Sequence, residues 1–389
     1  MKKDICIAFS ARLDKFGQVY PLIQKLRDRI THCYGVGTTK KETLPEDYPF
    51  EIMSCVNFNK VIMMAFVNPF IKLLKFPDYY HYWANVKILD WYFSHRIKHD
   101  KAKLLYTTPL FNYTIRVAKK KGMTVIINAG NSEPAREHRR ICEDYERFGI
   151  KHRYIYGGTS FRDTCLESMR LADKIISISE TSLKTYLEAG FDPRKLTVIP
   201  LTGTDFPLQP YEGNIGKQKA FISTAFHNFI KGTQELLLAW KKANIVDIPL
   251  IIVGRLCDDM REFIAKYGPF DNVIYEGHRA DLRDWYSTRD AVGVLLSLSE
   301  GAVRVTPEMM SFGFPMIVSP DATCDLVEDG KNGFIIDTHN IDEIAARLKW
   351  FASDWNRVHA MRQNILDSVS HRTVKDFSLE CADYITTLI

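Results

Sequence analysis

The sequence predicts an α/β protein of two domains, each built on a parallel β-sheet with helices packed on its faces. Short apolar runs alternate with amphipathic stretches along most of the chain, which is the pattern of repeated strand and helix units. Residues 201–214 separate two such series and carry two Pro and two Gly without periodicity. This composition predicts a linker between the domains.

The first series fills residues 1–200. Its expected strands are residues 5–9, 104–107, 125–128, 174–178 and 196–200. The last unit is the clearest, because the strand at 174–178 ends at Ser and Thr residues that can cap a helix. Gly190 and Pro193 then stop that helix before the next strand. A unit of strand, helix and strand favours parallel pairing.

The second series fills residues 215–370. Its expected strands are residues 219–224, 249–253, 273–275, 291–296, 315–318 and 333–336. Two α/β domains of similar size place a cleft between the carboxyl ends of their sheets, where open α/β sheets bind ligands. Residues 376–389 have a loose apolar face and predict a final helix.

Composition predicts a soluble, cytoplasmic protein. Of 389 residues, 46% are apolar and 25% are charged, and no segment reaches the roughly 18 uninterrupted apolar residues of a membrane span. The apolar run near the start is too short for a secretory signal. The eight cysteines are scattered without Cys-x-x-Cys pairs, which indicates reduced thiols.

The charge is divided unequally between the two halves. Residues 1–200 hold 33 basic and 21 acidic side chains (+12), whereas the remainder holds 19 and 26 (−7). The first half is therefore expected to meet an anionic partner: a membrane surface, a phosphorylated acceptor or nucleic acid. Residues 60–99 mix aliphatic, aromatic and basic side chains, which suits a membrane interface. A core insertion explains the same residues equally well.

The most informative stretch is residues 297–319. A strand ending near Ser297 delivers Glu300 to the expected cleft, and Thr306 as N-cap with Pro307 at the first helical position opens a new helix that Gly313 ends. The N-terminus of such a helix can hold a diphosphate. Glu308 lies in the first turn, where an acidic side chain can also simply complement the helix dipole.

Glu300 and Glu308, with seven residues between them, resemble the Glu-x7-Glu motif of retaining glycosyltransferases of the GT-B fold, family 4, also called group 1. Residues 306–319, 326–337 and 176–200 are similar to further segments of that family. The resemblance implies two Rossmann-like domains around a central cleft. The N-terminal domain, residues 1–200, would bind the acceptor, and residues 215–370 would bind the nucleotide-sugar. Residues 371–389 would return to the first domain.

The resemblance also implies roles for single residues. Glu300, followed by the backbone of Gly301, Ala302 and Val303, would meet the transferred sugar, and Glu308 would accept the ribose hydroxyls. Lys231 matches the lysine that binds the donor diphosphate, so Glu300 and Lys231 are the expected catalytic residues.

The family's arginine on the diphosphate has no counterpart here, because its position falls at Ala225. His227, Arg255 and Arg304 are the candidate replacements in donor binding, although each residue type is more often structural or solvated.

The first domain offers weaker signals. The family's Gly-rich loop is represented only by Gly17. The family's usual histidine after a middle strand is not evident, and Asn131 or Glu133 in the corresponding stretch would face the acceptor. A plain polar loop is the alternative reading.

No metal or other cofactor is expected. Asp258-Asp259 and Glu328-Asp329 lack the strand-end Asp-x-Asp context of metal-dependent transferases, and a helix dipole can replace the cation. The expected partners are a nucleoside-diphosphate sugar, a glycan or lipid-linked acceptor and an anionic membrane surface, with no nucleic acid.

The expected function is retaining sugar transfer in polysaccharide, lipopolysaccharide or other glycoconjugate assembly, by a protein that is cytoplasmic or peripheral on the cytoplasmic face of the membrane. Two alternatives stay open. One is a GT-B epimerase or phosphorylase. The other is a weakly active or non-catalytic partner subunit, which the alanine at position 225 makes reasonable.

Overall fold

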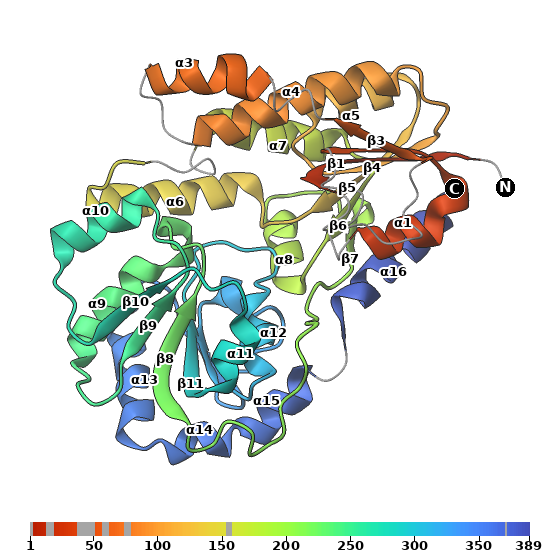
Figure 1. The fold of residues 1–389 in the computed structure, drawn as a ribbon. Helices are drawn as coiled ribbons and strands as arrows, with labels where there is room; N and C mark the ends of the chain where they lie inside the picture. Colours follow the sequence, from red (N-terminus) through yellow and green to blue (C-terminus); the bar gives the residue numbers. More distant parts are fainter. Residues whose placement is uncertain are drawn as a thin grey trace.

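The computed structural model describes residues 3–12, 19–36, 51–56, 62–73, 79–152, 158–369 and 372–389. Two sheets form the two halves of the molecule (Figure 1). The strand order is β3-β2-β1-β4-β5-β6-β7 in the first sheet and β10-β9-β8-β11-β12-β13 in the second. All the strand pairings are parallel. The predicted class, α/β with two parallel sheets, is confirmed.

Each strand expected from the sequence is present, with ends that shift by up to three residues. The first sheet contains β1 (Ile5–Arg12), β2 (Ile30–Val36), β3 (Met53–Val56), β4 (Leu104–Thr107), β5 (Thr124–Ala129), β6 (Lys174–Ser177) and β7 (Leu196–Val198). The second contains β8 (Gln218–Thr224), β9 (Leu250–Val253), β10 (Val273–Gly277), β11 (Arg289–Leu295), β12 (Met316–Val318) and β13 (Gly333–Ile335). The sequence analysis missed β2 and β3, because β2 mixes polar residues with apolar ones and β3 has only four residues.

Helices cover both faces of the first sheet. They are α1 (Tyr20–Leu26), α3 (Asn68–Leu73), α4 (Tyr79–Ile97), α5 (Asn112–Lys120), α6 (Pro134–Phe148), α7 (Thr159–Leu171) and α8 (Glu180–Glu188). Short 3-10 helices η1 (Arg27–Arg29) and η5 (Pro193–Lys195) and a π-helical segment η3 (Met63–Val67) accompany them. Successive residues of β1 alternate between the two cores: Ile5 and Ile7 lie in one, Cys6 and Ala8 in the other. This alternation follows from the two-residue repeat of a strand, and it explains why buried strands read as continuous apolar runs.

The second sheet is covered by α9 (Thr233–Ala243), α10 (Asp258–Tyr267), α11 (Leu282–Ser287), α12 (Val305–Met310), α13 (Ile341–Ser353), α14 (Asn356–Ala360) and α15 (Arg362–Val369), with turns η6 (Phe229–Lys231) and η7 (Pro320–Ala322). Its core also takes in side chains from α6 of the first domain, namely Ile141, Tyr145 and Phe148. The rings of Tyr145 and Phe229 stack with centroids 4.6 Å apart. Helix α6 therefore joins the two domains (Figure 1).

The last helix, α16 (Val374–Thr387), packs beside α1 on the first domain (Figure 1). Phe377, Cys381 and Ile385 are buried in the core that contains β1 and α1. Thr373 and Asp376 form a capping box that fixes the start of α16, since each side chain binds a main-chain N–H of the other residue.

The segment around α3 and α4 has two different faces. Val86, Leu89 and Phe93 of α4 are fully buried in the core of the first domain, whereas Phe66 and Leu73 on η3 and α3 are 72% and 78% exposed. Within the described residues, no helix is long and apolar enough to cross a membrane.

Candidate active site

Glu300 and Lys231 form an ion pair at the carboxyl end of the second sheet. Glu300 lies in the loop between β11 and α12, and Lys231 is the last residue of η6. The Glu300 side chain is 12% exposed and that of Lys231 is 26% exposed. Both side chains are therefore largely shielded from solvent, but each keeps an exposed part that a ligand can contact.

A glycine explains why Lys231 can reach Glu300. Gly232 has φ of +62°, and a Cβ on it would lie 1.9 Å from the main-chain oxygen of Leu296 near the end of β11. The absent side chain lets η6 pack directly against that strand end. The Leu298 N–H completes the contact by donating a 2.8 Å hydrogen bond to the Ile230 oxygen.

The first domain contacts the same loop. The Ser132 hydroxyl donates a 2.6 Å hydrogen bond to the main-chain oxygen of Glu300, and the Ser179 hydroxyl donates to that of Gly301. A Cβ on Gly301 would lie 2.2 Å from the oxygen of Gly130. The loops after β5 and β6 thus meet the loop after β11, so the carboxyl ends of the two sheets face each other.

Charged groups reinforce this contact between the domains. Asp321, whose side chain is 1% exposed, accepts hydrogen bonds from Arg136 at 2.7 Å and from Arg140 at 2.6 Å. Asp325 accepts the N–H groups of Glu180 and Thr181 in the first turn of α8, at 2.6 and 3.2 Å. An acidic side chain at a helix N-terminus also complements the helix dipole.

Asn131 and Glu133, expected on the acceptor side, lie on the loop between β5 and α6. The Asn131 oxygen accepts hydrogen bonds from Ser182 and Tyr186, both at 3.0 Å, so its main chain is fixed within the first domain. Glu133 is buried, and its carboxylate caps α6 by accepting the Arg136 N–H at 2.7 Å. The structure therefore gives Glu133 a capping role.

Glu137 is a site residue that the sequence analysis missed. It lies in the first turn of α6 and is buried, and the Ser299 hydroxyl donates to its Oε2 at 3.2 Å. Burial, together with the charge of Glu300, raises the pKa of Glu137 to about 8. An acid in the first turn of a helix is normally read as a solvated, dipole-complementing residue, so the sequence held no signal for it.

Glu308 lies within α12, with 14% of its side chain exposed and Arg304 at 3.9 Å. Burial raises its pKa to about 6. The start of α12 differs from the expectation. Arg304 occupies the N-cap position, and the Thr306 hydroxyl, expected to cap the helix, donates instead to the Ala322 oxygen at 2.9 Å. The prediction of Thr306 as N-cap was wrong because a tertiary hydrogen bond takes its hydroxyl.

The three candidate replacements for the missing arginine lie in different environments. His227 is fully buried, with Nδ1 bound to Thr233 at 2.9 Å and Nε2 to the Val253 oxygen at 3.0 Å. Burial lowers its pKa to about 4, so the ring is a neutral structural group. Arg255 is exposed, and its guanidinium lies 5.8 Å from the Phe226 ring. Arg304 has a side chain 44% exposed.

The remaining expected donor residues lie within or against a hydrophobic core, or outside the described residues. Ala302 packs against the core of the first domain, and Val303 is buried in the core of the second. Gly17 lies outside the described residues. Asp259 is an interior group that accepts hydrogen bonds from the Tyr145 hydroxyl at 2.6 Å and the Phe229 N–H at 3.2 Å.

Comparison with protein families identifies the second domain. Residues 208–367 match the family model of glycosyl transferases group 1. No curated protein matches the chain in sequence.

Several solved structures share the fold along the whole chain. HepE from Anabaena, solved in complex with UDP-glucose, matches with a TM-score of 0.65 and 17% identity over 98% of this chain and 99% of that one. The lipopolysaccharide outer core galactosyltransferase WaaB gives 0.59 and 14% identity, covering 98% and 99%. Sucrose-phosphate synthase from Thermosynechococcus elongatus gives 0.65 and 14% identity, covering 99% of each chain.

At these identities, the structural likeness shows the fold, and the family model shows the class of enzyme. Residues 208–367 therefore form a group 1 glycosyltransferase domain, and the chain as a whole has the two-domain GT-B fold.

Proposed function

We propose that this protein transfers a sugar from a nucleoside-diphosphate sugar to an acceptor hydroxyl with retention of the anomeric configuration. The ion pair between Lys231 and Glu300 is the observation that carries the proposal. A lysine ammonium held at this position can neutralise the charge that develops on a departing diphosphate. Uridine donors are the first to test, because HepE was solved with UDP and with UDP-glucose.

The proposed mechanism of transfer follows from the ion pair that Glu300 forms. Its carboxylate pairs with Lys231 and so acts as a partner of the cation rather than as a nucleophile. The acceptor oxygen then bonds to the anomeric carbon on the face from which the diphosphate departs. The bond from that carbon to the diphosphate oxygen breaks, and the same oxygen takes the acceptor proton. No metal is required, since Lys231 supplies the positive charge.

Glu308 is the proposed partner of the ribose hydroxyls. It lies on the short helix that follows Glu300, with a side chain only 14% exposed. A partly buried carboxylate forms stronger hydrogen bonds to hydroxyl donors than a solvated one does. Its position supports nucleotide binding by the second domain.

The acceptor would bind at the first domain, near the loop between β5 and α6. That loop touches Glu300 through Ser132, so an acceptor held there is adjacent to the transferred sugar. We place the reaction in glycoconjugate assembly, in line with the name of WaaB, a lipopolysaccharide outer core galactosyltransferase.

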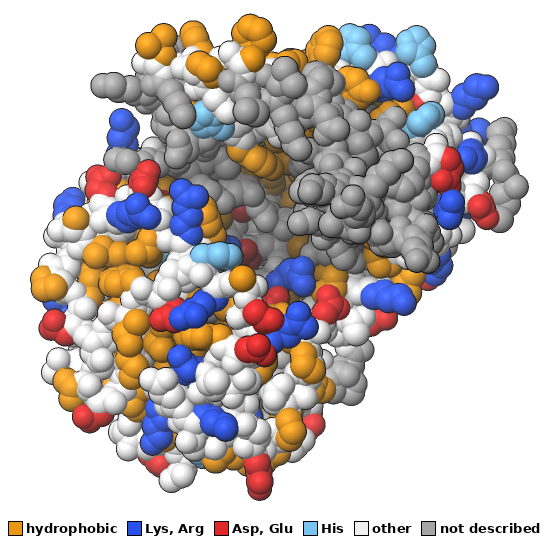
Figure 2. Space-filling view, viewed as in Figure 1, with side chains coloured by type: hydrophobic (Ala, Val, Ile, Leu, Met, Phe, Trp, Pro, Cys, Tyr) orange, Lys and Arg blue, Asp and Glu red, His pale blue; other side chains and the backbone are white. Residues whose placement is uncertain are grey.

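A membrane surface is the proposed site of action. Phe66, Phe70 and Leu73 are exposed on η3 and α3, and Figure 2 shows hydrophobic side chains along the edge of the molecule where α3 lies. Arg96 and Lys98 are exposed at the end of α4. Each basic side chain near an anionic leaflet contributes about 1 kcal/mol, so a few of them beside an apolar edge suffice for peripheral attachment at the cytoplasmic face.

A weakly active partner subunit is the second candidate. It is favoured by Ala225, which leaves Lys231 without the arginine expected beside it. The exposed Arg255 is two residues beyond Val253, the strand residue whose oxygen binds the Ala225 N–H. This sheet position makes Arg255 a candidate for the missing cation.

One experiment separates the two candidates. The purified full-length chain is mixed with UDP-, GDP- and ADP-sugars, thermal shifts select the donor, and NMR follows hydrolysis and transfer to simple acceptors. Retaining transfer would show as an α-linked product from an α-linked donor. A donor that shifts the melting temperature without any turnover would favour the partner subunit, and an inverted product would refute the retaining mechanism.

A further inference from the structure

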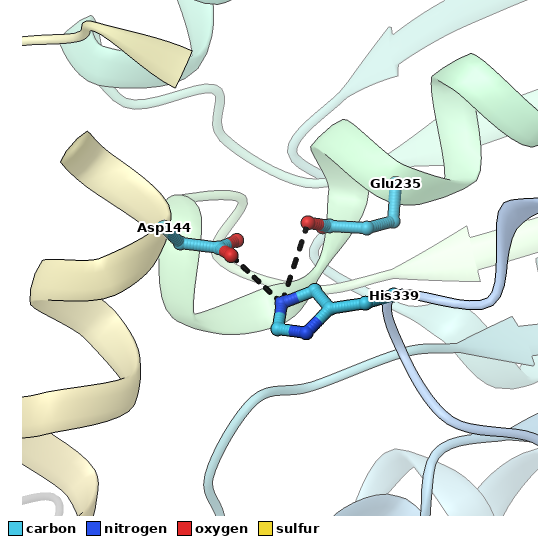
Figure 3. A group of neighbouring side chains, drawn as sticks. All are labelled: Asp144, Glu235 and His339. Carbon is cyan, nitrogen blue, oxygen red and sulfur yellow. Dashed lines mark hydrogen bonds and ion pairs between the residues drawn. The ribbon is translucent and has the colours of Figure 1, made fainter. Parts of the chain in front are cut away.

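Asp144, Glu235 and His339 converge on the contact between the two domains, away from the ion pair of the candidate active site (Figure 3). Asp144 lies near the C-terminal end of α6, Glu235 in the first turn of α9, and His339 between β13 and α13. One ligand atom from each residue lies within 4.8 Å of those of the other two. Among the described residues, this is the one group of three such side chains close enough to hold a metal ion.

Glu235 is the residue that requires an explanation. Its side chain is completely buried and points at the His339 ring (Figure 3). Within the described part of the chain, neither of its carboxylate oxygens has a hydrogen-bond partner. Arg147 and His339 approach Oε1 only to 3.6 and 3.9 Å. A buried polar group without a hydrogen-bond partner is costly, and a cation held between the three side chains would provide that partner.

Asp144 adds a second buried carboxylate. Its side chain is 1% exposed, and it accepts hydrogen bonds from His339 Nε2 at 2.8 Å and from Gln234 at 2.7 Å. His339 Nε2 hydrogen-bonds only one of the two carboxylates, and Glu235 has no hydrogen-bond donor among the described residues.

We propose that Asp144, Glu235 and His339 bind a divalent transition-metal ion, with Zn²⁺ or Mn²⁺ as the probe of choice. A divalent ion supplies two positive charges and can coordinate both carboxylates together with His339 Nε2. One imidazole and two carboxylates form a donor set that suits these ions better than Mg²⁺ or Ca²⁺, which prefer oxygen ligands. The His339 side chain is 37% exposed, which leaves room for water to complete the coordination.

The ion would have a positioning role, because its ligands come from both domains. It would tie the C-terminal end of α6 to α9 and to the loop before α13. The N-terminal end of the same helix carries Glu133 and Glu137, and Glu137 lies against Ser299, next to Glu300. A metal ion bound near the C-terminal end of α6 would hold this helix against the second domain. Because the N-terminal end of α6 contacts the second domain at the candidate active site, the ion would stabilise that contact as well. This inference does not depend on the proposed sugar transfer.

The test uses the full-length protein after treatment with a chelator. Isothermal titration with Zn²⁺, Mn²⁺, Mg²⁺ and Ca²⁺ measures stoichiometry and affinity, and thermal melts measure stabilisation. We expect one Zn²⁺ or Mn²⁺ per chain and a higher melting temperature. Glu235→Gln and His339→Gln should each weaken binding by at least about tenfold, because each removes one of only three protein ligands.

His359→Gln is the matched control. His359 Nε2 lies 2.8 Å from Asp290 Oδ2, so it forms a histidine–aspartate pair of the same length elsewhere in the second domain. Its substitution should leave metal binding unchanged. Circular dichroism of the metal-free variants checks that each one is folded. The proposal is overturned if the folded wild-type protein binds no transition metal, if binding survives in both ligand variants, or if Mg²⁺ binds as tightly as Zn²⁺.

Discussion

The hydroxyl of Ser132 in the first domain donates a 2.6 Å hydrogen bond to the main-chain oxygen of Glu300 in the second. Beside it, Gly130 and Gly301 approach so closely that a Cβ on Gly301 would lie 2.2 Å from the Gly130 oxygen. The loop that carries the proposed catalytic glutamate is therefore held by both domains. Its geometry therefore depends on how the two domains pack.

Ser132→Ala removes the hydrogen bond and leaves a main-chain oxygen without that donor. We expect a loss of about 1 kcal/mol in the free energy of unfolding and a fall in kcat of about tenfold, because small displacements of catalytic groups are costly. Denaturant unfolding and steady-state kinetics measure the two effects. Ser94→Ala is the control, since Ser94 makes a 2.7 Å bond to the Trp91 oxygen within α4. Equal losses of kcat in both variants would contradict the positioning role of Ser132.

Lys231→Ala and Glu300→Gln should each lower kcat by about a hundredfold or more. The first removes the ammonium group proposed to face the departing diphosphate, and the second removes the carboxylate that holds this ammonium in place. Circular dichroism should show an intact fold. Lys331→Ala is the control, since Lys331 pairs with Glu328 at 2.9 Å on the surface. If Lys231→Ala kept a near-normal rate, the diphosphate contact would pass to Arg255 or Arg304.

Glu137→Gln should change how stability depends on pH. The pKa of Glu137 is raised from 4.5 to about 8 in the folded protein, so the folded state retains its proton more strongly than the unfolded state does. The contribution of Glu137 to the free energy of unfolding is fully present below about pH 4.5. It decreases as the pH rises towards and through about 8, by up to about 1.4 kcal/mol for each pH unit. Glutamine stays neutral, so the variant should gain stability relative to wild type between pH 5 and 8. Parallel melting curves across that range would rule out a buried neutral carboxyl.

Glu308→Gln should remove a pH dependence of donor binding. The pKa of Glu308 is about 6 because the side chain is buried, so its carboxylate form dominates above pH 6. Wild-type affinity for UDP-glucose should fall between pH 7.5 and 5.5, and the variant should bind about 10- to 100-fold more weakly at pH 7.5, with a flat profile. UDP-glucose is preferred to UDP because it has no terminal phosphate that titrates in this range. An unchanged profile in the variant would remove Glu308 from the nucleotide site.

Double substitution of Phe66 and Phe70 by serine should weaken binding to anionic vesicles. Both side chains are exposed, at 72% and 58%, and each buries apolar area on insertion into the interface. Co-sedimentation with anionic and neutral vesicles, at low and high salt, gives the measurement. Val246→Ser, at a 72% exposed position in the second domain, is the control. Negligible binding of the wild type to both kinds of vesicle would end the membrane proposal without affecting the transferase activity.

Local patterns in the sequence were enough to predict the architecture. Buried parallel strands such as β4 and β9 are short apolar runs, because both faces of the sheet are covered by helices. Glu300 and Glu308 were found together because they lie on one loop and the helix that follows it. The strands β2 and β3 were missed, since polar side chains in one and the shortness of the other weaken the pattern.

The sequence by itself determined the alternation of strands and helices that builds the two sheets, because this pattern depends on neighbours a few residues apart. Glu300 and Glu308 were singled out by their resemblance to a family motif, and their roles stay predictions. The tertiary structure decided the rest. Ser132 and Glu300 are 168 positions apart, and Asp144, Glu235 and His339 come from three separate elements. Burial raises the pKa of Glu137 and lowers that of His227, and both shifts favour the neutral side chain. Desolvation and hydrogen bonding between distant segments set these properties, and they exist only once the two domains have packed together.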